Sequence, residues 1–554
     1  MPGRGTDASP PRTDGPGERP DRGDGPPRAV RPPLELPPAI LKDAFRLVRR
    51  DLTEGELRAL REFGRFAREE LEPTAYRIDR ELRPALRPSG PGDPPSLEVV
   101  LAPEHDQLLD RLYASGAVVR PFGSRRDWML GFAMLHEVAD VGLLCSATVT
   151  LATAFSLEKW GAPELRDRFL PPLLASGGRA QGATWATERQ GGSDLGATRT
   201  SAEPVDGLEW RLTGEKFFCS NVGASCAVVT ARPAGAPEGA RSLRLYFVPA
   251  RRRDGRPNWQ VRRLKEKLGT VTVPTGEVTF DGAEAYALGS ADSGVRPVME
   301  MLNVSRVANA VGSAAVLQRS FELAYDYARE RSAFGRRLFE QPLIALDLAT
   351  LAVESDAASL LAFDGTYRLG LSATKHARAS EPSELLRWTA HIAKLVTAEQ
   401  AVRGSQLAME ILGGVGYLEE LPVAKLVRDA LVTPIWEGGA NLQALDAREV
   451  ARRHHPEQHW VAAAGRAAAH SESLEVRRFL SVRLEALEHE GEEANAKRVA
   501  RTWGEVRQMT LLVGRAWDPL RKARAELFAR VRSGRTGETI AADLVTNALG
   551  AVHA

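Results

Sequence analysis

The stretch Thr-Glu-Arg-Gln-Gly-Gly-Ser-Asp, at residues 187–194, stands where the chain changes its hydrophobic pattern. Before it, apolar residues such as Leu57 and Leu60 recur at helical spacing, which predicts helices over residues 39–180. The stretch stands at the entry to residues 181–292, where short runs of β-branched and aromatic residues alternate with turns, which predicts strands. A helical region followed by a β region is an order that restricts the possible folds.

Helical periodicity returns after the β region. Val304, Val307 and Val311 form an apolar stripe at helical spacing, and long helices are expected over residues 293–455. A further helical segment rich in Arg, Glu and Ala covers residues 456–554. We therefore expect an α+β multidomain protein, with an N-terminal α-helical domain, a small antiparallel β-barrel or sandwich, and a helical C-terminal part.

Residues 1–38 are rich in Pro, Gly and Arg. This composition buries too little apolar surface to fold, so we expect a disordered tail. Contact between its arginines and an acidic partner stays open, although a solvated tail is the simpler interpretation. The tail lacks the apolar core of a secretory signal, and no segment of the chain reaches 18 consecutive apolar residues. We expect no membrane span and a cytoplasmic protein.

The charges of the 554 residues nearly cancel, with 74 Lys and Arg against 72 Asp and Glu, so composition alone implies no strongly charged partner. Cys145, Cys219 and Cys226 are too few for a disulfide framework and fit a reducing compartment. No His and Cys residues have zinc spacing, and the adjacent His454 and His455 would point in different directions on a helix. No metal site is expected.

Four stretches carry residues suited to binding or chemistry, although each alone has a simpler interpretation. A phosphate can approach the backbone closely at Gly191, Gly192 and Ser193. An ordinary glycine turn would have the same sequence pattern. The other three stretches are Gly214–Asn221, with two aromatic residues and a hydroxyl; Tyr327–Gly335, with Arg331 and a later Gln341; and Glu410–Tyr417, followed by Ile435–Asn441.

In this order, the four stretches resemble the acyl-CoA dehydrogenase family, and the resemblance covers most of the chain from about residue 130 to 453. Residues 187–194 are similar to the family's Thr-Glu-Pro-x-x-Gly-Ser-Asp signature, and residues 435–441 to its Tyr-Glu-Gly-Thr-x-Gln element. The resemblance implies a middle antiparallel β-barrel, a C-terminal four-helix bundle with a helical extension, and FAD as the cofactor.

The resemblance also implies the roles of individual residues. The implied FAD contacts are Thr187, Ser193, Phe218, Ser220, Arg331, Phe334, Gln341, Glu410, Gly413, Gly414, Gly439 and Asn441. The implied substrate contacts are Ser193, Arg306 and Gly438, and the implied substrate is acyl-CoA or another acyl thioester. In the family, the Arg of the third stretch reaches the FAD of a neighbouring subunit, which implies a homodimer or a homotetramer.

Glu437 occupies the position of the family's catalytic base. The α-hydrogen of a thioester is weakly acidic, so a carboxylate of raised pKa in a dry pocket suits its removal while the β-hydride leaves for the flavin. Some family members place the base on the first bundle helix, where this chain has Ser305, which cannot act as a comparable base. The related nitroalkane oxidases use Asp, so Glu437 speaks against that reaction without excluding it.

The chain also departs from the family pattern. Arg189 replaces Pro, Trp436 replaces Tyr, Glu410 replaces Gln and Gly439 replaces a hydroxyl residue. Several features resemble the AidB-like, alkylation-response branch, which binds DNA and has feeble dehydrogenase activity.

A DNA-binding flavoprotein is therefore the main alternative. Basic stretches within residues 251–267 and 521–535 would suit phosphates, although a solvated surface is equally open. A flavoprotein acting on a carrier-tethered acyl group is a third possibility. The sequence identifies neither the acyl chain nor the electron acceptor.

Overall fold

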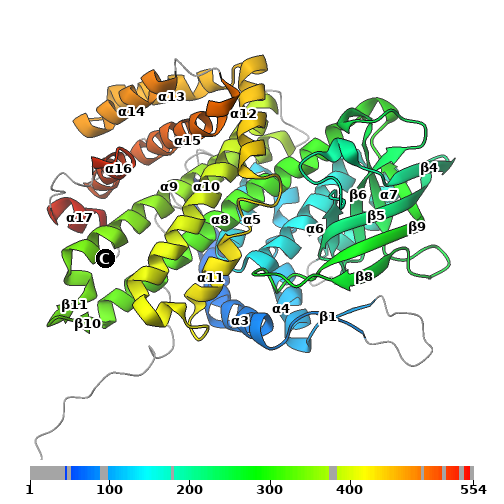
Figure 1. The fold of residues 1–554 in the computed structure, drawn as a ribbon, viewed down its shortest axis with the longest axis horizontal. Coiled ribbons are helices and arrows are strands. Elements are labelled where there is room, and N and C mark those ends of the chain that lie inside the picture. Colours follow the sequence, from blue (N-terminus) through cyan, green and yellow to red (C-terminus); the bar gives the residue numbers. More distant parts are fainter. Residues whose placement is uncertain are drawn as a thin grey trace, which may run out of the picture.

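A computed structural model describes residues 44–45, 51–87, 98–175, 180–373, 383–487, 492–514, 519–535 and 542–549 of the protein. The predicted tail at residues 1–38 lies outside these ranges. Helices, then strands, then helices follow one another along the chain, which confirms the predicted α+β class. The β region and the last helices lie at opposite ends of a central group of long helices (Figure 1).

The helices that precede the β region are α2 (Glu54–Phe66), α3 (Glu72–Arg80), α4 (Pro103–Ala114), α5 (Arg125–His136), α6 (Val141–Trp160) and α7 (Pro163–Leu174). Thr53 begins α2 with a capping box, since its backbone N–H donates to the Glu56 carboxylate at 2.7 Å. Among the described helices, only α6 is long and apolar enough to span a membrane by length and composition. Because 94% of that apolar stretch is buried inside the protein, α6 acts as a core helix.

The strands of the β region are β3 (Gly182–Trp185), β4 (Ser201–Asp206), β5 (Glu209–Ser220), β6 (Cys226–Pro233), β7 (Arg244–Pro249), β8 (Gln260–Leu264) and β9 (Thr275–Leu288). They lie in the order β3-β6-β4-β5-β9-β7, and β7 also pairs with β6, which closes the sheet into a barrel. Most pairs are antiparallel, as predicted, but β3 and β4 each pair with β6 in parallel. A separate hairpin joins β1 (Ala85–Leu86) and β2 (Val99–Val100).

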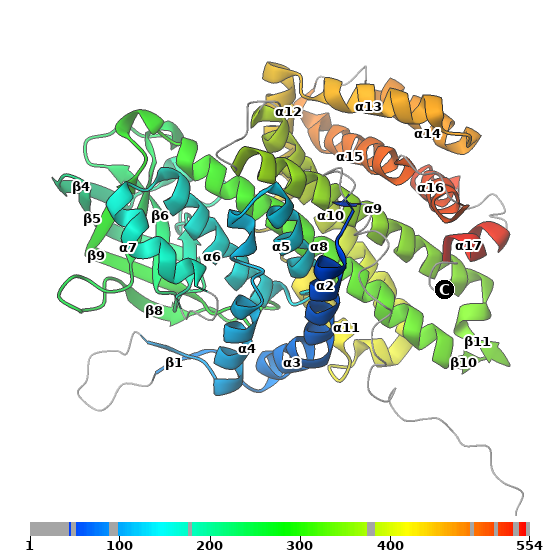
Figure 2. The same ribbon diagram turned by 180° about the vertical axis from the view of Figure 1, so that it is seen from behind.

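The central helices are α8 (Arg296–Glu330), α9 (Pro342–Ala373), α10 (Ser383–Leu412), α11 (Pro422–Ala430) and α12 (Ala440–His454). A small hairpin of β10 (Ser332–Ala333) and β11 (Arg336–Arg337) joins α8 to α9. The middle of α8 is buried on all sides, because α6, α9 and α10 pack around it. Seen from behind, the N-terminal helices cover one side of this bundle (Figure 2).

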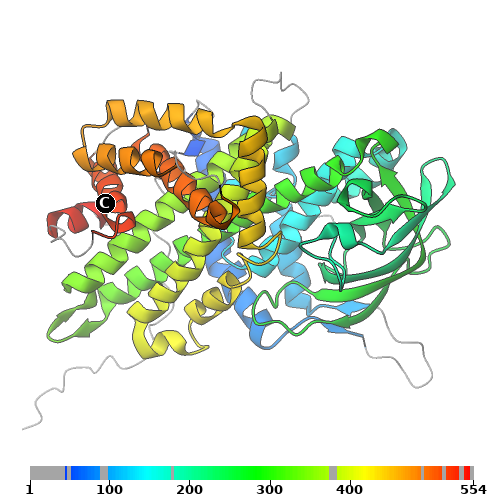
Figure 3. The same ribbon diagram turned by 45° about the horizontal axis from the view of Figure 1, so that its top comes forward.

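The extension consists of α13 (Glu457–His470), α14 (Leu474–Leu487), α15 (Ala496–Val513), α16 (Pro519–Arg532) and α17 (Ala542–Leu549). It lies across the bundle on the side away from the barrel (Figure 3). Arg507 of α15 donates to the buried carboxylate of Asp364 on α9 at 2.6 and 2.9 Å. Trp388 of α10 packs against Trp460, with ring centroids 4.4 Å apart. The extension thus shares the bundle's core.

Candidate active site

Glu437 lies in the turn between α11 and α12, with its backbone in the left-handed region at φ +55°. Gly438 follows at φ +96°. A left-handed backbone costs a non-glycine residue roughly 1–2 kcal/mol, so surrounding groups must hold it. Gln443 does so from α12, because its side-chain N–H donates to the carbonyls of Glu437 and Gly438 at 2.8 and 2.9 Å.

Two buried cations complete the support of this turn. Arg306 of α8 donates to the Glu437 carbonyl at 3.4 Å, and Lys394 of α10 donates to the Gly438 carbonyl at 2.7 Å. His391 Nδ1 lies 2.6 Å from the side-chain oxygen of Gln443 and so fixes the orientation of that amide. Three helices therefore converge on the backbone of Glu437 and Gly438.

Burial raises the pKa of the Glu437 carboxyl, and the nearby Arg306 and Lys394 only partly offset this increase. Burial also lowers the pKa of Arg306 to about 10 and that of Lys394 to about 7. A carboxylate whose pKa is raised is a stronger base than an exposed glutamate. Ser305, at the alternative position for a base, is buried and carries no ionisable group.

Trp436 closes the space behind the base. Its indole N–H donates to the side-chain oxygen of Asn309 on α8, and Asn309 in turn donates to the Thr433 carbonyl at 3.2 Å. The ring packs against a small apolar cluster formed by Cys145, Val149 and Val273. This packing lines the inner side of the site with apolar side chains.

Cys145 connects the base to the barrel. Its thiol interacts both with the Ser220 hydroxyl at the end of β5 and with Glu437. Burial, reinforced by the negative charge of Glu437, raises the pKa of this thiol to about 12, so the group stays protonated and neutral. Cys145 thus interacts with two groups that are 217 positions apart in the sequence, Ser220 of the barrel and Glu437.

The barrel residues near Ser220 fit a bound FAD. Phe218 is 56% exposed although it is a large apolar ring, as suits a residue that packs on a planar cofactor. Thr187 lies beside this strand, because its carbonyl accepts from the Phe217 N–H at 3.0 Å. A Cβ on Gly191 would lie 2.7 Å from the Asp194 carbonyl oxygen, so the turn that carries the exposed Ser193 requires glycine there.

Outside the barrel, the predicted site residues fall into two groups. Arg306, Gly438, Gly439 and Asn441 lie with Glu437 or on the turn and helix that carry it. The members of the second group, Arg331, Phe334, Gln341, Glu410, Gly413 and Gly414, lie at the other end of the bundle. Arg331 follows Arg306 by 25 residues along α8, which places it about 37 Å away.

The second group is on the surface. Phe334 is 97% exposed in a left-handed turn, and the Gln341 amide donates to the Ala333 carbonyl at 3.2 Å. A Cβ built on Gly413 or Gly414 would meet no atom within 4 Å. Within one chain, this group and Glu437 cannot belong to the same compact site.

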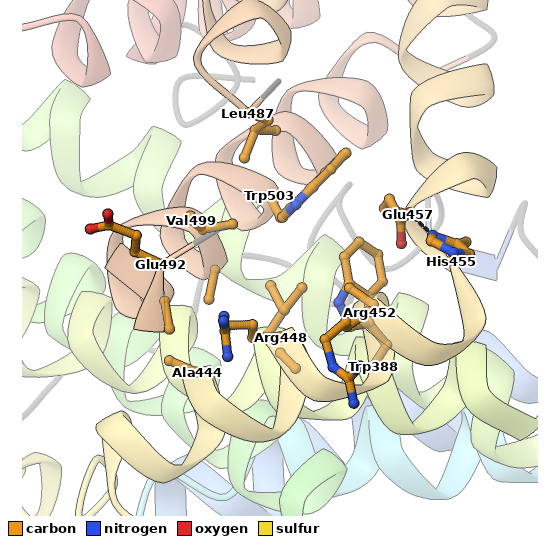
Figure 4. Close-up of a pocket in the computed structure, with 15 residues that line it drawn as sticks. Trp388, Ala444, Arg448, Arg452, His455, Glu457, Leu487, Glu492, Val499 and Trp503 are labelled. Carbon is orange, nitrogen blue, oxygen red and sulfur yellow. Dashed lines mark hydrogen bonds and ion pairs between the residues drawn. The ribbon is translucent and has the colours of Figure 1, made fainter. Parts of the chain in front are cut away.

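A cavity of about 290 Å³ lies elsewhere, between α10, α12 and α15 (Figure 4). Trp388, Trp503 and several alanines form its walls. At its rim His455 pairs with Glu457 at 3.2 Å, and Arg452 pairs with Glu449 at 3.0 Å. None of the predicted site residues lines this cavity, so we interpret it as a packing gap between the bundle and the extension.

Many cations of the two basic stretches have acidic partners in the fold. In the extension, Arg524 pairs with Asp356, Arg532 with Glu354, and Arg535 with Glu475. In the barrel, Arg253 pairs with Glu209, Arg262 with Glu215, and Arg263 and Lys265 with Glu277. These pairings reduce the positive potential that the sequence alone suggested.

Comparisons with known proteins agree with the fold. The model of the acyl-CoA dehydrogenase C-terminal domain matches residues 292–451, and that of the middle domain matches residues 183–283. An acyl-CoA dehydrogenase of Bacillus subtilis is 31% identical over 332 residues, which cover 58% of this chain and 82% of that protein. The putative acyl-CoA dehydrogenase AidB of Escherichia coli is 34% identical over 329 residues, covering 57% of this chain and 59% of AidB.

The match spans about half the length of the first curated relatives, 44% in one and 59% in AidB. The crystal structure of Caenorhabditis elegans ACDH-11 in complex with C11-CoA superposes with a TM-score of 0.81 at 26% identity, covering 91% of each chain. The likeness to that structure therefore includes most of the described chain.

Proposed function

This chain belongs to the acyl-CoA dehydrogenase family of FAD-dependent oxidoreductases, with AidB among its relatives, and we propose that it oxidises an acyl thioester between the α and β carbons. One observation carries the proposal most strongly. The Glu437 carboxyl, with a pKa raised by burial, sits on a rigid turn that Cys145 connects to the predicted flavin contact Ser220.

Each residue of the site has a separate role in the proposed reaction. Glu437 removes the α-proton, and its raised pKa matches it to a weak carbon acid. Trp436 and the cluster around Cys145 keep water away, which strengthens the electrostatic interactions of the site. Phe218 and Ser220 hold the cofactor against the barrel. FAD, when bound, supplies the acceptor for the β-hydride.

An acyl-CoA is the substrate that we propose, since ACDH-11 has been crystallised with C11-CoA. Anaerobic mixing of the FAD-loaded protein with acyl-CoAs of increasing chain length tests this. We expect at least one of them to bleach the oxidised flavin. If none does and a carrier-protein thioester does, the substrate is carrier-tethered instead. The electron acceptor is not assigned, and the cytoplasmic location stays a prediction.

We further propose that two chains share each cofactor, in a homodimer or a dimer of dimers. Phe334, Tyr417 and Leu343 are 97%, 81% and 77% exposed near the end of the bundle that carries the second group of predicted FAD contacts. Monomers rarely expose apolar patches of this kind, so a partner chain would cover them. That partner's barrel and base would then face Arg331 across the interface, completing a site that one chain leaves divided.

The first prediction concerns this interface. Phe334→Asp should turn the oligomer into a monomer and reduce bound FAD at least several-fold, because a buried unpaired charge opposes association. Light scattering and the ratio of flavin to protein absorbance measure the two effects. Val482→Asp is the matched control, since Val482 is 51% exposed on the extension and should leave both values unchanged. A Phe334→Asp protein that stays oligomeric and yellow contradicts the shared site.

DNA binding remains the alternative function, although the pairing of the basic residues with carboxylates offers it little support. If DNA binds, the contact should be independent of base sequence and weaken steeply with salt. Reversing the charges of Arg256 and Arg262, whose side chains are 74% and 50% exposed, should then lower both the affinity and the salt slope. No binding at low salt removes this alternative.

A further inference from the structure

Lys394 is a buried cation that the proposed chemistry does not yet use. It lies in the middle of α10 and is fully buried. Its ammonium donates to the Gly438 carbonyl at 2.7 Å, and the negative charge of Glu437 favours its protonated form. An ammonium in a protein interior costs several kcal/mol unless it is paired. The Gly438 carbonyl that it binds and the charge of Glu437 therefore explain best the position of Lys394.

The turn at Glu437 and Gly438 needs such a group. Both residues have positive φ, and both carbonyls point towards side-chain donors. Arg306 and Gln443 approach the Glu437 carbonyl, whereas Lys394 and Gln443 approach that of Gly438. Lys394 is the donor to this turn that comes from α10, so it fixes the turn against the bundle.

We propose that Lys394 is a positioning residue for the base, holding the turn of Glu437 and Gly438 through the Gly438 carbonyl while its charge keeps the Glu437 carboxylate ionised. This inference rests on the proposed role of Glu437. It extends that role by naming a group that contributes, together with Arg306, to the pH at which the base is active.

Other charged and titratable groups also face this region. They come from four helices: Arg306 of α8, Arg387 and His391 of α10, Asp446 of α12 and Cys145 of α6. Arg306 lowers the pKa of Glu437, and Arg387 lowers the pKa of Arg306 and of His391. The Cys145 thiol is neutral. Arg306 and Lys394 each combine a hydrogen bond to the turn with an electrostatic interaction with Glu437, but the hydrogen bond of Lys394 is the shorter, at 2.7 Å against 3.4 Å.

The sign of the expected effect follows from this arrangement. Lys394 is charged below its lowered pKa of about 7, and in that range removing it takes away an interaction that favours the charged carboxylate, so the pKa of Glu437 should rise further. The rate of flavin reduction increases with pH as Glu437 loses its proton. The midpoint of that increase should therefore move to higher pH, by about 1 unit for the loss of one close opposite charge.

Two variants separate the charge from the hydrogen bond. Lys394→Gln loses the charge but keeps a donor for the Gly438 carbonyl, and Lys394→Met loses both. The midpoint should rise in both variants. The plateau rate at high pH should stay near the wild-type value in Lys394→Gln and fall in Lys394→Met.

Arg403→Met, at a 65% exposed cation of the same helix, is the control and should change neither quantity. If Lys394→Met does not fold, Lys394→Gln alone decides the shift in midpoint.

A second readout needs no turnover. In protein with ¹³C-labelled glutamate, the Glu437 carboxyl signal can be assigned by its disappearance in Glu437→Gln and then titrated with FAD bound. A higher titration midpoint in Lys394→Gln supports the inference even if no acyl thioester bleaches the wild-type flavin, an outcome that would overturn only the proposed function. An unchanged midpoint in a Lys394→Gln protein that retains FAD overturns the role of Lys394.

Discussion

Glu437→Gln should slow substrate-driven flavin reduction by at least about 100-fold, the contribution expected of a positioned general base. Glutamine keeps the shape of the side chain but cannot take the α-proton. The supports of the turn act on the carbonyls of Glu437 and Gly438, so they should persist. FAD content and oligomeric state should therefore match the wild type. Stopped-flow absorbance under anaerobic conditions measures the rate.

The pH profile adds a second criterion. Because burial raises the pKa of Glu437, the wild-type rate should rise with pH through a midpoint above the ordinary value of a glutamate. Glu437→Gln should lack this rise. Glu420→Gln, a change at an exposed glutamate near the start of α11, should keep both the rate and the profile. Reduction of Glu437→Gln at the wild-type rate would show that another group is the base.

Lys425→Met should lower the free energy of unfolding by roughly 3–5 kcal/mol, since removing one partner of a buried ion pair strands the other. The Lys425 ammonium lies 2.6 Å from Asp140 at the start of α6 and also contacts Asp429 on α11. Asp140 accepts from the Thr272 hydroxyl at 2.6 Å, and Asp429 from the Thr270 N–H at 2.6 Å. This cluster ties the loop before β9 to two helices.

Urea unfolding of the FAD-loaded protein measures the effect of Lys425→Met. FAD should also dissociate at a lower urea concentration, because the same loop carries Val273 of the cluster behind the base. Lys159→Met removes a partly exposed pair with Glu300 and should cost less than about 1 kcal/mol. If Lys425→Met lowered the free energy of unfolding by less than about 1 kcal/mol as well, the buried carboxylates of Asp140 and Asp429 would not need Lys425 as a partner.

The elements with strong local signals could be predicted from the sequence. Glycine and hydroxyl residues marked the entry to the barrel, and Glu437 was identified by its place beside Gly438 in a known pattern. The change from helical to strand-like periodicity fell close to β3, which begins at Gly182. Periodicity does not report which strands pair, so the parallel pairings of β6 with β3 and β4 could not be anticipated.

The residues that position the base were missed for a related reason. Gln443 and His391 meet only when α10 and α12 pack together, and neither stands in a recognisable pattern. Lys394 could have been noticed in the sequence, because it is the single cation in the apolar stretch Ile392–Val396. Likewise, the sequence does not show which carboxylates pair with the basic stretch near the end of the chain, since Glu354 and Asp356 lie about 170 positions earlier.

The most direct test of the account is a single-turnover measurement with a reactive acyl-CoA carrying deuterium at the α or the β carbon. Loss of the α-proton to Glu437 and of the β-hydride to the flavin predicts that each label slows anaerobic flavin bleaching several-fold at saturating substrate. Equal bleaching rates for the unlabelled, α-labelled and β-labelled substrates would contradict the claim that this site breaks both bonds.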